Sequence, residues 1–302
     1  MTEINTHLSA EHARSMSEIT QSPLQRQGAT SLWLSKVLPW VDVSSGIYQV
    51  NRTDAKTHEA IEIKAGHSYK EEGVLPKTAP RPDCKPRQYD LDVVQTILQL
   101  HTRAVDLYNK PYEPTAEQIR LTIESLREKQ EHEMVNNPEF GLLKVVDPKQ
   151  CIKANGGPNP DLLDELISRR RNTQFLFAHP KTIAAIGRAW NAGGLVSQHV
   201  PLGDSLVPSW RGIPLLSCSK IPTDGGKSSI IAIRTGEDRE GVIGLRPKAL
   251  PDQCEPGVNI RFMGINDQAI ISYLISAYFS VAVLDPTALG VLEDIEIGQS
   301  AE

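Results

Sequence analysis

The chain has 302 residues and a mass of 33.3 kDa, enough for one large domain or two small ones around a buried core. Its formal net charge is −5 and its pI is about 5.9, so the composition gives no electrostatic support for binding a nucleic acid. The first ninety residues are also balanced, with eleven basic and eleven acidic side chains. We therefore expect no nucleic-acid partner.

Residues 1–45 are typical of a segment that protrudes from a compact body. They are rich in Ser, Thr, Gln, Glu and His and have few apolar positions before Trp33 and Leu34. No charged region followed by an apolar one opens the sequence, so we expect no secretory signal. Residues 31–43 become apolar enough to dock on the surface of the body, and we expect Trp33 and Leu34 to contact neighbouring molecules.

Residues 46–75 predict a β-hairpin that protrudes from the body. Ile47 and Tyr48 begin one alternating run, and Ile61 and Ile63 belong to a second run beyond a polar turn. An isolated hairpin is marginal in water, because two strands bury too little apolar surface to offset the cost of backbone ordering. We therefore expect these four side chains to contact another copy of the chain.

A proline-rich connector over residues 76–88 leads into two expected helices. Apolar residues spaced by three and four predict the first helix over residues 91–108. The second is expected from Pro114 to Asn136, with charged residues around a narrow apolar stripe that predicts a surface position. Within it, Glu131-His132-Glu133 is interpreted as a solvated helix face and not as a set of metal ligands.

The second half of the chain alternates short helices with strands. Helices are expected over residues 160–171 and from Pro180 to the glycine pair at 193–194. Strands are expected over residues 173–179, 213–217, 229–234, 242–245 and 258–262. The apolar run at 270–284 is too short and too rich in serine for a membrane-spanning helix, so we expect no membrane partner.

None of the motifs predicts catalysis or ligand binding. Gly225-Gly226-Lys227-Ser228 ends like a phosphate-binding loop, but Ile221 stands where the first glycine should be, and we interpret the segment as a β-turn. The four cysteines form no C-x-x-C pair and the eight histidines no H-x-x-x-H pair. We expect no enzyme activity, no catalytic residue, no cofactor and no metal, with free thiols in a reducing cytoplasm.

The order of these elements resembles the Hong Kong 97 phage major capsid protein fold, the HK97-like fold, which is α+β. The resemblance implies an N-arm at 1–45, an E-loop hairpin at 46–75, a peripheral domain at 76–172 and 262–302, and an axial domain at 173–261. Within that fold, the N-arm and two segments resemble the shell proteins of encapsulin family 2A. These segments are FLFAHPKTIAAIGRAWNAGG and INDQAIISYLISAYFSVAVLDPTALGVLEDIEI.

This resemblance implies a structural protein that self-assembles, in about sixty copies, into an icosahedral encapsulin nanocompartment. The implied cargo enzyme is a cysteine desulfurase, which would connect the shell to sulfur metabolism or storage. Axial-domain loops of this fold gather at the five-fold axis, so Ser197, Gln198 and His199 are candidates to line a pore. Two alternatives remain open, a phage or prophage major capsid protein and a soluble α/β enzyme.

Overall fold

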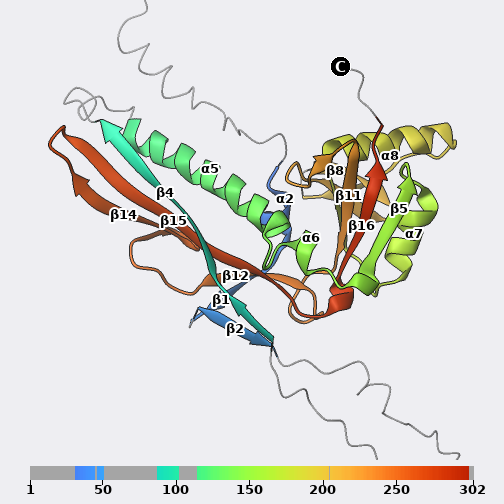
Figure 1. Ribbon diagram of the computed structural model, residues 1–302, viewed down its shortest axis with the longest axis horizontal. Helices are drawn as coiled ribbons and strands as arrows, with labels where there is room; N and C mark the ends of the chain where they lie inside the picture. The colour runs from blue at the N-terminus through green and yellow to red at the C-terminus, as the bar shows by residue number, and fades with distance from the viewer. Residues whose placement is uncertain (1–30, 45, 51–86, 102–113, 204, 299–302) are drawn as a thin grey trace, which may run out of the picture.

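The computed structural model describes residues 31–44, 46–50, 87–101, 114–203 and 205–298. The molecule is elongated, with a long sheet and a long helix at one end and a second sheet flanked by helices at the other (Figure 1). Helices and strands are mixed along the chain, as the α+β prediction requires.

The long sheet is built around β15 (Ile270–Val283), a strand of 14 residues that forms antiparallel pairs with β4, β12 and β14. The other strands of this sheet are β1 (Trp40–Val43), β4 (Asp92–His101), β12 (Val242–Pro247), β13 (Gln253–Glu255) and β14 (Val258–Ile265). Ser276 and Ser280 are an even number apart and share one face of β15, whereas Phe279 and Val281 point into the core on the other. Among the described residues, no helix is long and apolar enough to cross a membrane.

The helix predicted over residues 91–108 is wrong for the described part, which is strand β4. Val94 and Leu98 are four apart, a spacing that fits one face of a helix but equally places both side chains on one face of a strand. Ten residues of β4 pair with ten of β15, and this long-range pairing decides the structure. Residues 102–108 lie outside the described part of the chain.

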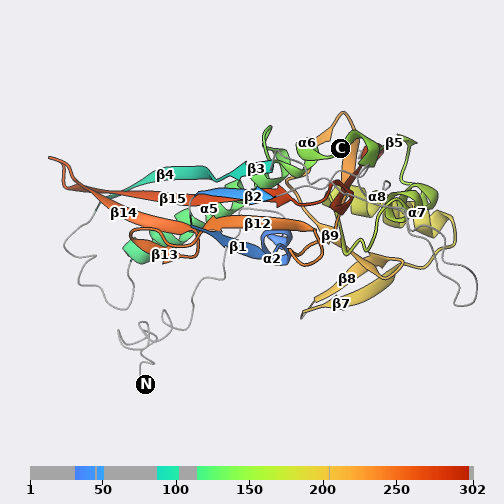
Figure 2. The ribbon, with the colours of Figure 1, turned by 90° about the horizontal axis from the view of Figure 1, so that it is seen from below.

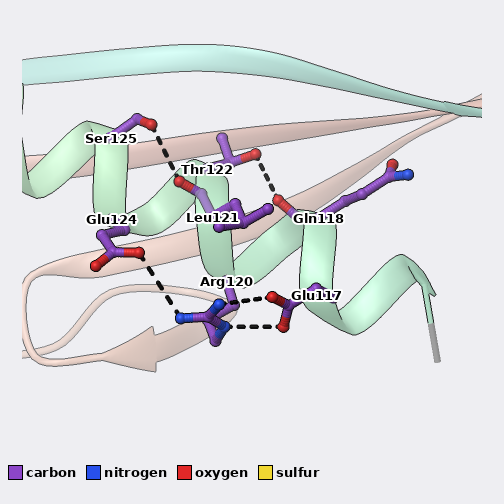
Figure 3. A network of polar contacts seen from close by, with 7 residues as sticks. All are labelled: Glu117, Gln118, Arg120, Leu121, Thr122, Glu124 and Ser125. Carbon is purple, nitrogen blue, oxygen red and sulfur yellow. Dashed lines mark hydrogen bonds and ion pairs between the residues drawn. The ribbon is translucent and has the colours of Figure 1, made fainter. Parts of the chain in front are cut away.

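The helix α5 (Pro114–Asn136) has the predicted bounds and lies along the long sheet (Figure 1). Its early turns carry a partly buried charged network, in which Arg120 reaches Glu117 at 2.6 Å and Glu124 at 3.7 Å (Figure 3). Near its other end the Met134 side chain is fully buried in the main core. The helix therefore begins on the surface, as predicted, and ends inside the molecule.

The second sheet has eight strands and two flanking helices, α7 (Pro160–Ser168) and α8 (Pro180–Ala192). Its strands in spatial order are β5 (Cys151–Gly156), β16 (Leu289–Glu296), β11 (Lys227–Ile233), β6 (Phe175–Ala178), β9 (Ile213–Ser217), β8 (Ser205–Trp210) and β7 (Gln198–Leu202), with β10 (Thr223–Asp224) on β11. Leu163 and Leu166 of α7 and Ile186 and Trp190 of α8 pack on one face of this sheet. The predicted strands and helices of this half are confirmed within a few residues.

Both faces of the second sheet are covered. The face opposite α7 and α8 packs against the end of α5 and against α2 (Trp33–Val37), where Phe177 and Ile231 meet Leu34 and Met134. Residues 31–43 thus dock on the body as predicted, but Leu34 and Leu38 reach its core and do not stay at its surface. This segment is part of the core, and β1 within it pairs parallel to β12.

The sheets exchange strands across the predicted domain boundaries. β12, β13 and the first half of β14, which the prediction places in the axial domain, belong to the long sheet, whereas β5, α7 and β16 belong to the second sheet and its layer of helices. The prediction divides the chain at residues 172 and 261, but partners far apart in sequence decide which sheet a strand joins.

The segment Gly225-Gly226-Lys227-Ser228 contains a tight hairpin turn, as predicted. Gly225 and Gly226 connect β10 to β11 with φ angles of +57° and +75°. Two successive positive φ angles are the geometry of a type I′ turn, which favours glycine. Short helices elsewhere in the described residues are α6 (Leu142–Val145), η1 (Pro148–Gln150) and η2 (Pro286–Ala288).

Candidate functional site

The base of the predicted hairpin is a pair of short antiparallel strands, β2 (Ile47–Val50) and β3 (Arg87–Asp90). The partner of the first strand at this base therefore comes after the predicted end of the E-loop at residue 75. Ile61 and Ile63, the two candidates in the second run, lie outside the described residues.

Two tyrosines fix this base to the body. The Tyr48 hydroxyl donates a hydrogen bond to Glu237 Oε1 at 2.7 Å, and the Tyr89 hydroxyl donates one to the Val283 carbonyl at 2.6 Å. Burial, followed by the hydrogen bond to Glu237, raises the pKa of Tyr48 to about 12. Tyr48 thus has a partner within its own chain, while 44% of Ile47 is exposed on the same strand.

The other two arm candidates lie on α2. Only 1% of Leu34 is exposed, and it packs in the core of its own chain. Trp33 is partly buried against the same core and carries the Lys36 ammonium at 5.4 Å from its ring centre. The structure thus places Leu34 away from any neighbouring molecule and leaves Trp33 at the surface of the core.

The root of the N-arm is held by a buried carboxylate, Glu131 of α5. Its Oε1 accepts the backbone N–H of Leu34 at 3.0 Å, and the N–H of Ser35 also donates to it. Burial raises the pKa of Glu131 to about 7, against the opposing effect of these two hydrogen bonds. The solvated-face interpretation is therefore wrong for Glu131, although it holds for the exposed His132.

The surroundings of Glu131 are polar but closed to water. Lys220 forms an ion pair with Glu128, one turn before Glu131 on α5. The Glu128 charge raises the pKa of Glu131 further, whereas the Lys220 charge lowers it. Burial also raises the pKa of the nearby Cys218 thiol to about 12, so this cysteine is a core residue and not a nucleophile.

The pore candidates lie together where the chain leaves α8 for β7. Gln198 and His199 are the first residues of β7 and are exposed, and Ser197 precedes them with partial exposure. Val196, immediately before Ser197 in the sequence, is 88% exposed. The β7–β8 hairpin that carries these residues projects from the second sheet (Figure 2).

An apolar surface at the far end of the long sheet was not anticipated from the sequence. The exposed side chains there are Ile97, Phe262, Met263 and Ile265, which we call the tip patch. The register places Ile97 beside Leu274 on one face of the sheet and Phe262 beside Tyr273 on the other. The residues of the tip patch belong to β4 and β14, two strands that extend to the left end of the long sheet in Figure 1. In addition, β4 pairs only with β15 among the described residues, so it is an edge strand.

Comparison with known proteins shows the family to which this chain belongs. Residues 48–299 match the family described as "Type 2A encapsulin shell protein SrpI-like". The chain is 41% identical over 292 residues to a type 2A encapsulin shell protein of Mycolicibacterium paratuberculosis, covering 96% of this chain and 94% of the relative. It is also 41% identical over 289 residues to the type 2A encapsulin shell protein SrpI of Synechococcus elongatus, covering 95% and 93%. The chain belongs to the type 2A encapsulin shell protein family.

Solved structures agree with this assignment. The holo-SrpI encapsulin complex of Synechococcus elongatus superposes with a TM-score of 0.81 and 38% identity, covering 98% of this chain and 99% of that one. The capsid of a native GTA particle superposes with a TM-score of 0.65 over 96% of this chain and 100% of that one. The identity to the GTA capsid is 12%, so this likeness shows the fold alone. The predicted HK97-like capsid fold and the predicted encapsulin family are both confirmed.

Family membership also bears on the alternatives that the sequence left open. Identity of about two residues in five over almost the whole chain is to encapsulin shell proteins, whereas phage and GTA capsids share only the fold. The protein is a structural shell protein by family, which does not favour a soluble α/β enzyme.

Proposed function

We propose that this encapsulin shell protein assembles with copies of itself, about sixty in a closed icosahedral particle, and encloses a cargo enzyme in the cytoplasm. The observation that carries the proposal is the superposition, over almost the entire chain, on a subunit of a holo-SrpI encapsulin complex. Closed symmetry turns many modest contacts into a durable container, because each subunit is held by several neighbours at once.

The surfaces of the subunit support such contacts. We propose that the front segments at 1–45 and 46–75 reach neighbouring subunits through Trp33, Ile47 and the second hairpin run with Ile61 and Ile63. An extended segment that pairs with an edge strand gains backbone hydrogen bonds without new folding of its partner. The exposed edge of β4 and the tip patch are suitable acceptors for such contacts.

The cargo that we propose is a cysteine desulfurase, which would place the particle in sulfur metabolism or storage. The resemblance to family 2A supports this choice, and the pyridoxal phosphate of the enzyme would belong to the cargo and not to this chain. We further propose that small solutes pass through a pore lined by Ser197, Gln198 and His199.

Co-expression tests assembly and cargo together. The shell protein is produced with a tagged cysteine desulfurase and, in parallel, with an unrelated tagged enzyme of similar size. We expect particles visible by electron microscopy, with the desulfurase alone retained inside after size exclusion. Closed particles that retain both enzymes equally would contradict the cargo proposal, and the absence of particles would contradict the shell proposal.

A further inference from the structure

A cluster of arginines surrounds a cavity that none of the surfaces above uses. The cavity measures about 690 Å³ and lies where the connection from α7 to β6, the loop from β11 to β12 and the residues around η2 come together. Five of its lining residues are basic: Arg169, Arg170, Arg171, Arg234 and Arg239. Arginine presents a fixed fork of N–H donors that matches the oxygens of phosphate and sulfate.

Arg234 is the buried centre of this cluster, with 6% of its surface exposed. Its Nη1 donates to the Arg171 carbonyl at 2.9 Å, and its Nη2 donates to the Glu240 carbonyl at 3.3 Å and to Thr287 Oγ1 at 3.4 Å. Its Nε has no hydrogen-bond partner. Within the described part of the chain, no carboxylate forms an ion pair with Arg234.

Arg170 is a second buried guanidinium, 8% exposed. It donates to the carbonyls of Leu166 and Gln150, and its Nε is also without a partner. It lies directly over Gly290, where a Cβ atom would fall 1.6 Å from Arg170 Cζ, so only glycine leaves room for it. Burial lowers the pKa of Arg170 to about 10, which still leaves it charged at neutral pH.

The acidic residues of the cavity do not neutralise these charges. Asp285 uses its carboxylate to accept the Thr287 N–H at 2.6 Å, which caps η2. Asp238 and Glu240 are exposed and form no ion pair among the described residues. Only Arg169 has an acidic partner, Glu165 one turn earlier on α7. Buried charge without a counterion is costly, which favours an anion from outside the chain.

We propose that this cavity binds a tetrahedral oxyanion of the phosphate or sulfate class. The buried Arg234 supplies charge at the base, and Arg171 and Arg239 close over the anion from the exposed rim. The cavity is larger than one inorganic ion, so the oxyanion is either free or the phosphate group of a small ester. The inference stands on the arginine cluster and does not depend on the proposed cargo or pore.

The site is also connected to the base of the hairpin. The loop that contributes Arg234 and Arg239 carries Glu237, the acceptor of the Tyr48 hydroxyl. An anion that orders this loop therefore restrains the anchor of β2. We expect slower amide hydrogen exchange over Ile47–Val50 when phosphate is bound.

Equilibrium dialysis of the full-length assembled protein against labelled inorganic phosphate tests the site, with ionic strength held constant by sodium chloride. We expect saturable binding of about one phosphate per chain and competition by sulfate. The exposed rim variants Arg171→Gln and Arg239→Gln should weaken binding by about tenfold each, whereas Arg261→Gln, an equal change of charge on β14, should not. A parallel titration with ribose 5-phosphate separates the sources, because tighter binding than phosphate identifies an ester.

Two results would overturn the proposal. One is the absence of saturable binding of phosphate and ribose 5-phosphate up to about 10 mM, a concentration that would nearly saturate a site with a millimolar dissociation constant. The other is equal binding by Arg239→Gln and Arg261→Gln, which would reduce the effect to net charge. The rim variants carry the test because Arg234→Gln removes buried hydrogen bonds and so affects folding as well.

Discussion

The two ends of this subunit differ in how completely they cover themselves. In the second sheet, Ile230, Ile231, Ala232 and Ile233 are buried one after another, because helices pack on one face and the main core on the other. At the far end of the long sheet, large apolar side chains are exposed, and β4 is an edge strand within the described part of the chain. The comparison teaches that the centre of the second sheet is covered within a single chain, whereas the far end of the long sheet and the β7–β8 hairpin, with Val196 and Leu206 exposed, leave apolar side chains for neighbours to cover.

The buried root of the N-arm lies between these two ends. α2 packs into the core shared by both sheets, and Glu131 binds its first backbone N–H groups. The arm therefore begins from a fixed point, and the position of Leu34 is set before any neighbour arrives. Contacts between subunits then start from a preorganised base, which lowers the entropy lost on assembly.

The largest loss of stability is expected from a substitution in the core of the second sheet. Phe177→Ala removes a fully buried ring from β6 and should cost about 3 to 5 kcal/mol of the free energy of unfolding, because the cavity cannot collapse in a sheet packed on both faces. Urea unfolding of the subunit measures this loss. Leu206→Ala, at an exposed position of β8, is the control and should be nearly neutral. Equal losses of unfolding free energy for the two variants would contradict the claim that the second sheet is packed on both faces within one chain.

The next largest effect on the free energy of unfolding is expected at Glu131. The direction of its pH dependence follows from the raised pKa of this carboxyl. The folded state holds the proton up to about pH 7, whereas the unfolded state releases it near 4.5, so the folded state binds more protons between these values. Stability contributed by this group should therefore fall as pH rises through that window, by an amount on the order of 3 kcal/mol. Glu131→Gln should remove this fall and be more stable than the parent chain at pH 8.

Glu133→Gln is the matched control on the same helix. The hydrogen bond from Lys129 lowers the pKa of Glu133, so its contribution is present above the unfolded pKa and is lost as pH falls. Urea unfolding at a series of pH values distinguishes the two carboxylates by opposite slopes. If the free energy of unfolding of Glu131→Gln depends on pH as that of the parent chain does from pH 5 to 8, the raised pKa of Glu131 is contradicted.

The tip patch should matter little to the subunit and much to the particle. Met263→Lys with Ile265→Lys places charge on exposed apolar positions of β14, so the free energy of unfolding should change by less than about 0.5 kcal/mol. The concentration needed for assembly should rise at least about tenfold if neighbours cover these side chains. Light scattering against concentration measures this, with Gln268→Lys, an exposed position near the same end, as control. Unaltered assembly would remove the tip patch from the interface.

The smallest change is expected at the proposed pore. Gln198→Ala and His199→Ala alter exposed side chains and should leave both unfolding and assembly as they are. Entry of a small polar solute into the particle should slow, because an apolar rim passes such solutes less readily than a hydrated one. Gln253→Ala, exposed on β13, is the control. Equal entry rates in all three variants would contradict the pore assignment.

Much of the fold could be predicted from the sequence, because local signals decide much of it. α5 ends where Pro138 follows, and Pro180 marks the first turn of α8. β4 could not be predicted locally, because its spacing fits a helix and a strand alike and its pairing with β15 spans much of the chain. The assignment of strands to the two sheets could not be predicted for the same reason.

The candidate site was predicted less well than the fold. The sequence assigns Leu34 to a neighbour because an apolar run in a polar arm suggests an external partner, yet Leu34 is buried in the same core as Met134 and Phe279. Glu131 was missed although a signal exists. It precedes Met134 by three residues and Val135 by four, the spacing of one helix face, so an acid there is placed among apolar residues.

The mass of the purified full-length protein tests the central claim most directly. Sedimentation velocity at micromolar concentration should show a discrete species of about sixty subunits, with little free chain. A well-folded solitary subunit under the same conditions would contradict the account, because the exposed end of the long sheet would then need no neighbour.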